Sequence, residues 1–311
     1  MTAPLRVEDL QSDRKRTGRE RRVRVVVFTT AAVSLLISVL IVGSLLGEAW
    51  SFISELVSAG DLGELWADGW FPRRNQFGIS TLLVGSLVVS AIAMMVAIPV
   101  GLAAAIYLSE YADRRVRKVL KPTLEVLAGI PSVVLGFFAF QFISPELLQR
   151  FFDGTPQNNL AAAGIGVGIL TIPLVASVSE DAMRAVPMSL REASYGLGAR
   201  KYTTCIKVVI PAALSGLVAA MIIAVSRAIG ETMVVAIAAG GSGGALFSYD
   251  PLEPGTTMTA AMISQAGGTD AVAGQGPSFQ SLFFVGLLLF VITLSMNTVA
   301  DRFVRRFREI Y

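Results

Sequence analysis

Six long apolar runs constrain this chain more than any other feature of its sequence. A helix needs about 20 predominantly apolar residues to cross a hydrocarbon core of ~30 Å. Runs of this character cover residues 25–46, a stretch within 76–109, and residues 126–143, 160–179, 213–239 and 282–300. They are apolar on every face, whereas a membrane-spanning barrel strand alternates over about 10 residues. The sequence therefore predicts an all-α, polytopic membrane protein with six transmembrane helices.

The composition agrees with a membrane setting and removes several kinds of site. Hydrophobic residues make up 53% of the chain and charged residues only 16%, against about 25% charged residues in soluble domains. The chain has no histidine and one cysteine, Cys205. That excludes an internal disulfide, histidine-based zinc or haem sites, and Ser-His or Cys-His nucleophiles. We expect no catalytic residue, no metal site and no cofactor in this chain.

Lysine and arginine set the predicted orientation, because loops rich in these residues stay in the cytoplasm. The N-terminal segment, residues 114–121 and 184–207, and the C-terminal tail hold 22 of the 26 basic residues. Both termini are therefore predicted to be cytoplasmic, in a multi-pass protein of the cell membrane. The first run is longer than the roughly 7–15 apolar residues of a signal peptide, so we expect it to be retained as an anchor.

These predictions divide the chain into five parts. They are a basic cytoplasmic segment (1–24), a first transmembrane helix (25–46), an external loop (47–76), a five-helix core (77–300) with a cytoplasmic loop at 183–211, and a cytoplasmic tail (301–311).

A glycine run at residues 240–244 imitates two catalytic motifs. A phosphate-binding P-loop needs Gly-x4-Gly-Lys-Ser/Thr, and no lysine follows this run. Ser242 also matches the GxSG of rhomboid-type intramembrane proteases, but no histidine exists to activate it and every lysine lies on the predicted inner side. We interpret the run as an outer loop, and we expect ATP to bind elsewhere than on this chain.

The inner loop between the fourth and fifth runs has the features of two short helices. The sequence predicts a helix start at Pro187, a break at Gly198 and a second start at Pro211. Side chains then available to pack on a partner are Leu190, Ala193, Leu197 and Tyr202.

The same loop carries a family signature. Glu192-Ala193-Ser194, followed after three residues by Gly198 and after nine more by Val208-x-Ile210-Pro211, resembles the EAA signature (EAA-x3-G-x9-I-x-L-P) of permease subunits of bacterial ABC importers. Ser194, Val208 and Ile210 are mild departures from that pattern. The stretches EVLAGIPSVVLGFFAF (125–140), SEDAMRAVPMSLREASYGLGA (179–199) and SRAIGETMVVA (226–236) are similar to PstC-type permeases of phosphate-specific importers. The resemblance covers most of the chain from the second run onward.

The resemblance implies the MetI-like fold of type I importer permeases and a set of partners. The inner loop would be a coupling helix that docks on a cytoplasmic ATPase, an alternative being a solvated amphipathic loop at the lipid surface. The coupling residues would be Glu192, Ala193, Ser194, Gly198 and Pro211. The implied partners are a second, homologous permease of PstA type, a PstB-type ATPase dimer that binds ATP and Mg, and an external phosphate-binding protein of PstS type. No nucleic acid is expected.

Arg227 and Glu231, inside the fifth run, are the candidates for a substrate path. Four residues apart on a helix, they would share one face within pairing distance. An arginine at the bilayer centre costs at least ~2.5–3.5 kcal/mol, so it faces a polar path or a partner. A guanidinium group is always charged and forks two donors toward adjacent oxygens, which suits a tetrahedral oxyanion. We expect Glu231 to hold Arg227 when the path is empty and to yield it to phosphate.

The PstC-type resemblance gives this pair the same role, and the alternative is a salt bridge that only fixes helix packing. Secondary polar candidates, more simply explained as interface or capping groups, are Glu125, Gln141, Glu180, Asp181 and Asn297.

The predicted function is a membrane-spanning permease subunit that forms half of the path of an ATP-driven phosphate importer. Two alternatives stay open. One is an ABC permease for another oxyanion, such as sulfate or molybdate, which a lone arginine does not distinguish by charge. The other is an ion-driven secondary phosphate transporter that works without an ATPase.

Overall fold

The computed structural model describes residues 14–240, 244–267 and 276–307, with side chains from Glu20 to Arg302 inside these ranges. Five helical segments are long and apolar enough to cross a membrane, and a bent helix pair brings the number to six if it counts as one span. The five segments are Glu20–Ala59, Ile79–Tyr111, Ser132–Phe151, Leu160–Arg184 and Pro277–Arg302. The predicted all-α membrane fold is confirmed.

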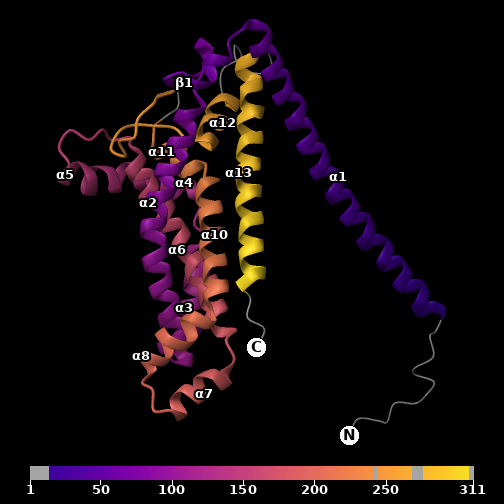
Figure 1. Cartoon of the computed structure of the whole chain (residues 1–311), viewed down its shortest axis with the longest axis vertical. Coiled ribbons are helices and arrows are strands. Elements are labelled where there is room, and N and C mark those ends of the chain that lie inside the picture. The colour runs from indigo at the N-terminus through magenta and orange to yellow at the C-terminus, as the bar shows by residue number, and fades with distance from the viewer. Residues whose placement is uncertain (1–13, 241–243, 268–275, 308–311) are drawn as a thin grey trace.

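Helix α1 (Arg14–Ala59) slants away from the rest of the molecule over most of its length (Figure 1). It contains the predicted first span, but it continues past the predicted end to Ala59, so residues 47–59 are helical and not part of an external loop. The reason is an apolar stripe at Ala49, Phe52 and Leu56, which is buried against the end of the molecule that the sequence predicts to be the outer one. Glu48 and Glu55, each one residue before a stripe position, are outside the buried stripe.

The centre of the molecule is the close packing of α2 (Ile79–Ile106) against α6 (Leu160–Arg184). Glycines make the close approach possible. A Cβ atom at Gly101, Gly164 or Gly168 would lie 2.7–2.8 Å from a side-chain carbon of the facing helix. Small residues at such contacts are the usual means by which membrane helices pack. A short π-helix, η4 (Tyr107–Tyr111), continues α2 to its inner end.

The third span begins later than predicted. Residues 126 and 127 belong to α3 (Arg114–Leu127), an amphipathic helix, and the span itself runs through α4 (Ser132–Phe138), η5 (Ala139–Leu148) and α5 (Gln149–Phe151). Pro131 separates the two parts, because a proline disfavours helical geometry in the residue before it. Pro131 itself has the extended ψ of 133° that precedes a new helix.

The fifth run is not one continuous helix, which corrects the prediction for residues 213–239. Helix α10 (Leu214–Ile229) is followed by a three-residue break and by the short helix α11 (Met233–Ala238). At its inner end α10 meets a segment of α8 (Lys201–Thr204), η6 (Cys205–Val209) and α9 (Ile210–Ala212) at a bend of 70°.

A small cap closes the outer end. It is built from η2 (Leu62–Trp66), β1 (Gly69–Phe71), η3 (Pro72–Arg74), β2 (Gln76–Phe77), β3 (Ala245–Leu246) and α12 (Met258–Ala266). The three strands form an antiparallel sheet in the order β2-β1-β3, with Trp70 opposite Phe77 on one side and Ala245 on the other. Trp70, Phe77 and Phe52 of α1 pack edge to face, which ties α1 to the cap.

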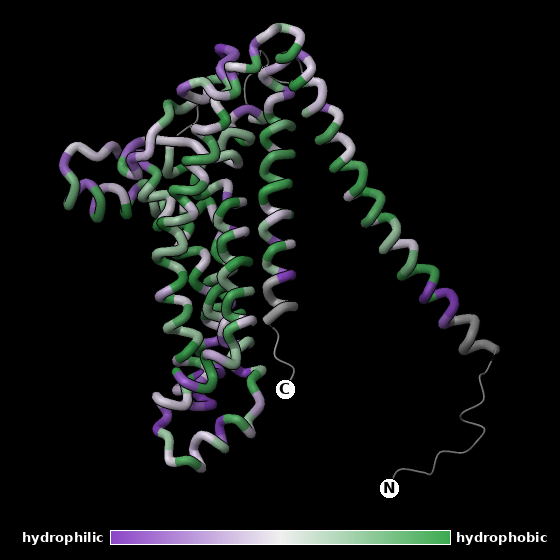
Figure 2. Tube along the Cα trace, in the orientation of Figure 1, coloured by the Kyte–Doolittle hydropathy of each residue, from purple (hydrophilic) through white to green (hydrophobic). Residues whose placement is uncertain are grey.

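The start of α1, the end of α13 (Pro277–Phe307) and the α7 (Met188–Gly196) and α8 region lie at one end of the molecule, and the cap lies at the other (Figure 1). Figure 2 shows apolar residues along the middle of α1, α2 and α13 and hydrophilic residues gathered near α7. This distribution matches a band of lipid between two aqueous ends.

Candidate functional site

The break between α10 and α11 occupies the sequence Gly230-Glu231-Thr232. The Gly230 N–H donates to the Ser226 carbonyl at 3.3 Å, and the Glu231 N–H donates to the Ala228 carbonyl at 3.2 Å. The Thr232 hydroxyl donates to the Gly230 carbonyl at 3.1 Å. The backbone freed by the break thus finds partners inside the protein, as it must within a membrane.

Arg227 lies in the last turn of α10 and is exposed in this chain. Ala224 and Ala228, close to it on the helix surface, are buried, so Arg227 lies at the edge of the face of α10 that packs on the core. Its neighbour Ser226 donates a hydrogen bond to Asn297 Oδ1 on α13 at 3.1 Å. The guanidinium group is therefore presented on an open side of α10, next to a polar link to α13.

The expected pairing of Arg227 with Glu231 is not formed. Among the described residues no ion pair joins them, and α10 ends at Ile229, between the two. The four-residue spacing places two side chains on one face only while the helix continues, so the break removes the geometry on which the prediction rested. Glu231 is instead half-buried in the break.

An open cavity of about 600 Å³ lies at this break. Its lining residues are Ser132, Gly230, Glu231, Thr232, Met233, Thr259, Met262, Ile263 and Leu289. They come from α4, the break, α11, α12 and α13, and they include two threonines, a serine and a carboxylate. Thr259 also donates to the Glu231 carbonyl at 2.7 Å, which fixes the break against α12. Arg227 is placed one helical turn before the cavity and does not line it.

The sequence pointed to Glu231 but missed Ser132 and Thr259. The helix that starts after Pro131 is what puts Ser132 at the cavity. Nothing in the chain order relates α4 or α12 to the break.

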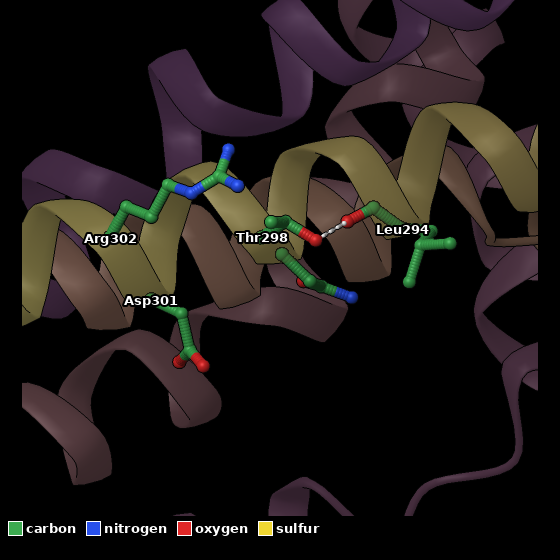
Figure 3. Close-up of a pocket in the computed structure, with 5 residues that line it drawn as sticks. Leu294, Thr298, Asp301 and Arg302 are labelled. Carbon is green, nitrogen blue, oxygen red and sulfur yellow. Dashed lines mark hydrogen bonds between the residues drawn. The ribbon is translucent and has the colours of Figure 1, made fainter.

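A second open cavity, of about 450 Å³, lies near the inner end of α13. It is lined by Leu294, Asn297, Thr298, Asp301 and Arg302. Figure 3 shows the Thr298 hydroxyl bonded to the Leu294 carbonyl, with Asp301 and Arg302 extending from α13 in opposite directions. Asn297, a secondary candidate from the sequence, therefore belongs both to this cavity and to the link with Ser226.

The predicted inner loop is two short helices, α7 and α8, joined by a tight turn. Helix α7 follows Pro187 as predicted, and Gly198 in the turn has φ +78°, a left-handed conformation that side chains disfavour. The Ser194 and Thr204 hydroxyl groups are hydrogen-bonded at 2.9 Å across the turn. Ser194 is therefore a buried internal tie and does not face a partner.

The outer surface of this loop is apolar and open. Leu197 is 90% exposed and Tyr202 68% exposed. Glu192 and Ala193 are also exposed. Pro211 is exposed as well, but it lies near the end of the helical segment 201–212, just before the bend, so the predicted helix start at Pro211 is wrong: the segment begins at Lys201. Leu190 does not join this surface, because it packs inward against the core cluster of Met183 and Val209.

One arginine pins α7 to the end of α6. Arg191, on α7, donates to the carbonyl oxygens of Val186 at 2.6 Å and Met183 at 2.9 Å. It also pairs with Glu110 of η4 at 3.0 Å, and both side chains are at least 89% buried. In the sequence, Arg191 is only one of the basic residues that predict the orientation of the chain.

A second ionic cluster surrounds Glu180, whose side chain is completely buried at the inner end of α6. Lys121 Nζ of α3 lies 2.6 Å from Glu180 Oε2 and 2.7 Å from Asp181 Oδ1. Arg117 Nε and Arg184 Nη1 lie 3.7 and 3.5 Å from Glu180 Oε1. Burial opposes the charge on Lys121, but the hydrogen bonds to Asp181 and Glu180 and their negative charges outweigh it and raise the pKa of Lys121 above its ordinary value of 10.5.

The described residues contain no group of three or more Cys, Asp or Glu side chains arranged to hold a metal ion. Ser242, which matches a protease motif in the sequence, lies outside the described residues.

The sequence of this chain is similar to those of known transport proteins. The family profile described as "Binding-protein-dependent transport system inner membrane component" matches residues 97–309. The phosphate transport system permease protein PstC of Mesorhizobium japonicum is 32% identical over 293 residues, covering 88% of this chain and 86% of the relative. PstC of Haemophilus influenzae is 32% identical over 292 residues, covering 85% of this chain and 87% of the relative.

The fold is also that of a solved transporter. An inward-facing structure of the MetNI methionine ABC transporter superimposes with a TM-score of 0.53 at 21% identity, over 75% of this chain and 95% of the compared chain. This likeness concerns the fold alone and confirms the predicted MetI-like architecture. From the profile and the relatives together, the chain belongs to the family of binding-protein-dependent transport system inner membrane components.

Proposed function

We propose that this chain forms half of the membrane path of an ATP-driven phosphate importer. Support comes from relatives named as phosphate transport permeases over most of the chain. The observation that carries the proposal is Arg227, a fixed cation on an open side of α10, one turn from a broken helix and its cavity. Broken helices next to cavities are where transporters commonly bind their substrates.

Arg227 is the proposed substrate-binding cation. A guanidinium cannot lose its charge at physiological pH, and its planar fork matches two oxygens of a phosphate group. Because it is exposed in the isolated chain, a second permease seated against this side of α10 would enclose it within a shared path. The insertion cost of ~2.5–3.5 kcal/mol explains why such a residue belongs beside a polar path.

Glu231 is proposed to keep the site weak. Its carboxylate lines the cavity one turn beyond Arg227 and is not neutralised by it. A phosphate anion moving from Arg227 toward the cavity, or the reverse, meets a like charge with hydroxyl groups of Thr232 and Thr259 nearby. The arrangement favours brief occupancy over tight binding, as a conduit needs.

The α7–α8 loop is the proposed docking element for the motor. Its exposed Glu192 and Ala193, the rigid turn at Gly198 and the bend that follows Pro211 would receive the push of an ATPase dimer, while Ser194 holds the turn together. ATP and Mg would bind to that ATPase and not to this chain. The full assembly would add a second permease of PstA type, a PstB-type ATPase pair and a PstS-type phosphate-binding protein outside.

The positions of the ends support a cell-membrane protein with both termini in the cytoplasm. The start of α1 and the end of α13 lie at the α7–α8 end of the molecule (Figure 1), which is the end that must meet the motor. Residues 1–24 and 301–311 would then be cytoplasmic, residues 60–76 external, and residues 77–300 the permease core with its inner loop at 183–211.

The test is phosphate uptake by the complete complex in proteoliposomes. Arg227→Gln should lower ATP-driven uptake about 10- to 100-fold, since hydrogen bonds to charged groups contribute ~1.5–3 kcal/mol. Uptake by Arg227→Lys should fall between that of wild type and that of Arg227→Gln, because lysine keeps the charge but lacks the two-donor fork. Arg150→Gln on α5, an equally exposed arginine, is the matched control and should transport normally. Normal uptake by a fully assembled Arg227→Gln complex would refute the assigned site.

The same preparation separates the alternatives. Excess sulfate or molybdate should leave phosphate uptake unchanged, and strong competition would instead indicate a different oxyanion. Uptake by the purified chain alone, driven by an ion gradient without the ATPase, would indicate a secondary transporter.

A further inference from the structure

The ionic cluster at Glu180 joins two parts of the molecule that the chain order keeps apart. One is the end of α6, which leads into the α7–α8 loop. The other is α3, which leads through Pro131 into Ser132 at the wall of the 600 Å³ cavity. Neither the sequence signature nor the substrate site accounts for this connection.

On the loop side, the connection is stiff. Arg191 binds α7 to the carbonyl groups of Met183, in the last turn of α6, and of Val186, two residues after the helix ends. Met183 is fully buried and lies one helical turn after Glu180 on the same helix. A displacement of α7 is therefore carried to Glu180 without a flexible step.

On the cavity side, the connection is stiff as well. Backbone hydrogen bonds continue past the end of α3, from Ala128 to Leu124, from Gly129 to Val126 and from Ile130 to Leu127. Val134 N–H then donates to the Pro131 carbonyl at the start of α4. Only Pro131, whose ring fixes its φ, lies between the last of these turns and Ser132, so a shift of α3 is passed to that wall of the cavity.

Between these two stiff parts stand the short contacts of Lys121 with Glu180 and Asp181, at 2.6 and 2.7 Å. Arg117 adds a second attachment, because it lies near Glu180 and also donates to the Leu108 and Ser109 carbonyl groups of η4, which continues α2. The buried carboxylate cannot be left without a cation, since an unpaired buried charge is strongly unfavourable. Of the three cations around Glu180, Lys121 makes the shortest contact, so it is the main tie between α3 and α6.

We propose that Lys121 and Glu180 are positioning residues that make α3 move together with the α7–α8 loop, so that the motor's push reaches the Ser132 wall of the substrate cavity. This proposal rests on the proposed transport function and names the route inside this chain by which it is driven. Lys121 does not touch substrate. It acts by fixing α3 to the helix end that the motor moves.

Lys121→Met is the informative variant. Methionine keeps the length of the side chain and removes its charge, while Arg117 and Arg184 still neutralise Glu180, so the fold should survive. Lys121→Arg should restore the bridge. Lys118→Met is the matched control, because Lys118 is an exposed lysine three residues away on the same helix.

The first readout is the number of phosphate ions imported per ATP hydrolysed by the complete complex. Lys121→Met should assemble normally and lower this ratio about tenfold, as expected for losing one energetic coupling between two sites. Lys121→Arg and Lys118→Met should stay close to wild type. If Lys121→Met keeps the wild-type ratio, the bridge has no positioning role, whereas absent uptake by the wild-type complex would count against the proposed function instead.

The second readout does not depend on transport. In a Cys205→Ser background, which removes the native cysteine, spin labels at the exposed positions Thr123 on α3 and Ser189 on α7 report their separation. Wild type should give one distance both without nucleotide and with ATP and vanadate, because the two helices move as a unit. Lys121→Met should give different distances in the two states. A nucleotide-dependent distance in wild type would overturn the proposal.

Discussion

At Arg227 a permanently charged and exposed side chain is placed in an apolar helix without a carboxylate partner, unlike the buried charges of Glu180, Arg191 and Glu110. Glu180, Arg191 and Glu110 each find an opposite charge within 4 Å. Arg227 finds none among the described residues, and it is left on an open side of α10. A charge that the fold does not neutralise by itself is suited to an ion that arrives from outside the fold.

The ion pairs of Lys121 make the stability of the folded protein depend on pH. It faces Glu180 and Asp181, with Arg117 and Arg184 on the far side of Glu180. Because its pKa is raised in the folded protein, its stabilising effect is fully present below the ordinary value of 10.5 and is lost as pH rises through the raised folded value.

The expected result is a melting-temperature difference between wild type and Lys121→Met that is constant from neutral pH to about pH 9 and shrinks above pH 10.5. Thermal unfolding in detergent, monitored by tryptophan fluorescence, measures it. Lys118→Met serves as control, and a difference that grows with alkaline pH would contradict the assigned ion pair.

Among the elements, the α7–α8 loop shows how a short segment can be rigid without a large core. Its turn is fixed by the left-handed Gly198, by the bond between Ser194 and Thr204, and by Arg191 at its base. The polar ties lie inside the loop, and the side chains of Leu197 and Tyr202 remain outside. A segment of this kind transmits a displacement because it does not deform when it is pushed.

Gly198→Val tests that rigidity. A β-branched residue at φ +78° is strained by roughly 1–2 kcal/mol, so the turn should open and ATP hydrolysis should continue with phosphate uptake reduced severalfold. Gly154→Val provides a close control, because Gly154 has φ +83° and, like Gly198, has no atom within 4 Å of an added Cβ, but it lies in the outer loop after α5. Equal effects of the two variants on the ratio of uptake to hydrolysis would argue against a coupling role.

For the whole molecule, the two ends differ in construction. The cap end has a small sheet and buried aromatic residues, whereas the α7 end has the ionic clusters of Glu180 and Arg191. The helices between them are apolar on their exposed sides, as lipid requires. The asymmetry fits a carrier-docking side and a motor-docking side.

Sidedness can be measured with single cysteines in the Cys205→Ser background. Ser58→Cys near the end of α1 should react with a membrane-impermeant maleimide in intact cells, and Leu197→Cys in the α7–α8 turn should react only after the membrane is opened. Both positions are exposed, so accessibility depends on the side of the membrane alone. The reverse labelling pattern would place the termini outside.

The sequence by itself determined the membrane class, the helical content, the position of the inner loop and the residue types of the candidate site. These properties depend on local quantities: apolar length, basic loop charge, proline and glycine positions, and the EAA-like spacing. The family prediction is confirmed for the same reason, because its motif lies in one continuous segment. The charges at Arg227 and Glu231 were visible because any charge in an apolar run stands out.

Only the tertiary structure decided how those charges are related. The hydrogen bond from Thr259 stabilises a helix break that the spacing of residues in the sequence does not predict. That break separates Arg227 from Glu231. Ser132 and Thr259 reach the cavity, and Lys121 reaches Glu180, through contacts between segments far apart in the chain. Such contacts depend on how whole helices pack. Helices α2 and α6 approach closely because glycines on each helix face side chains of the other.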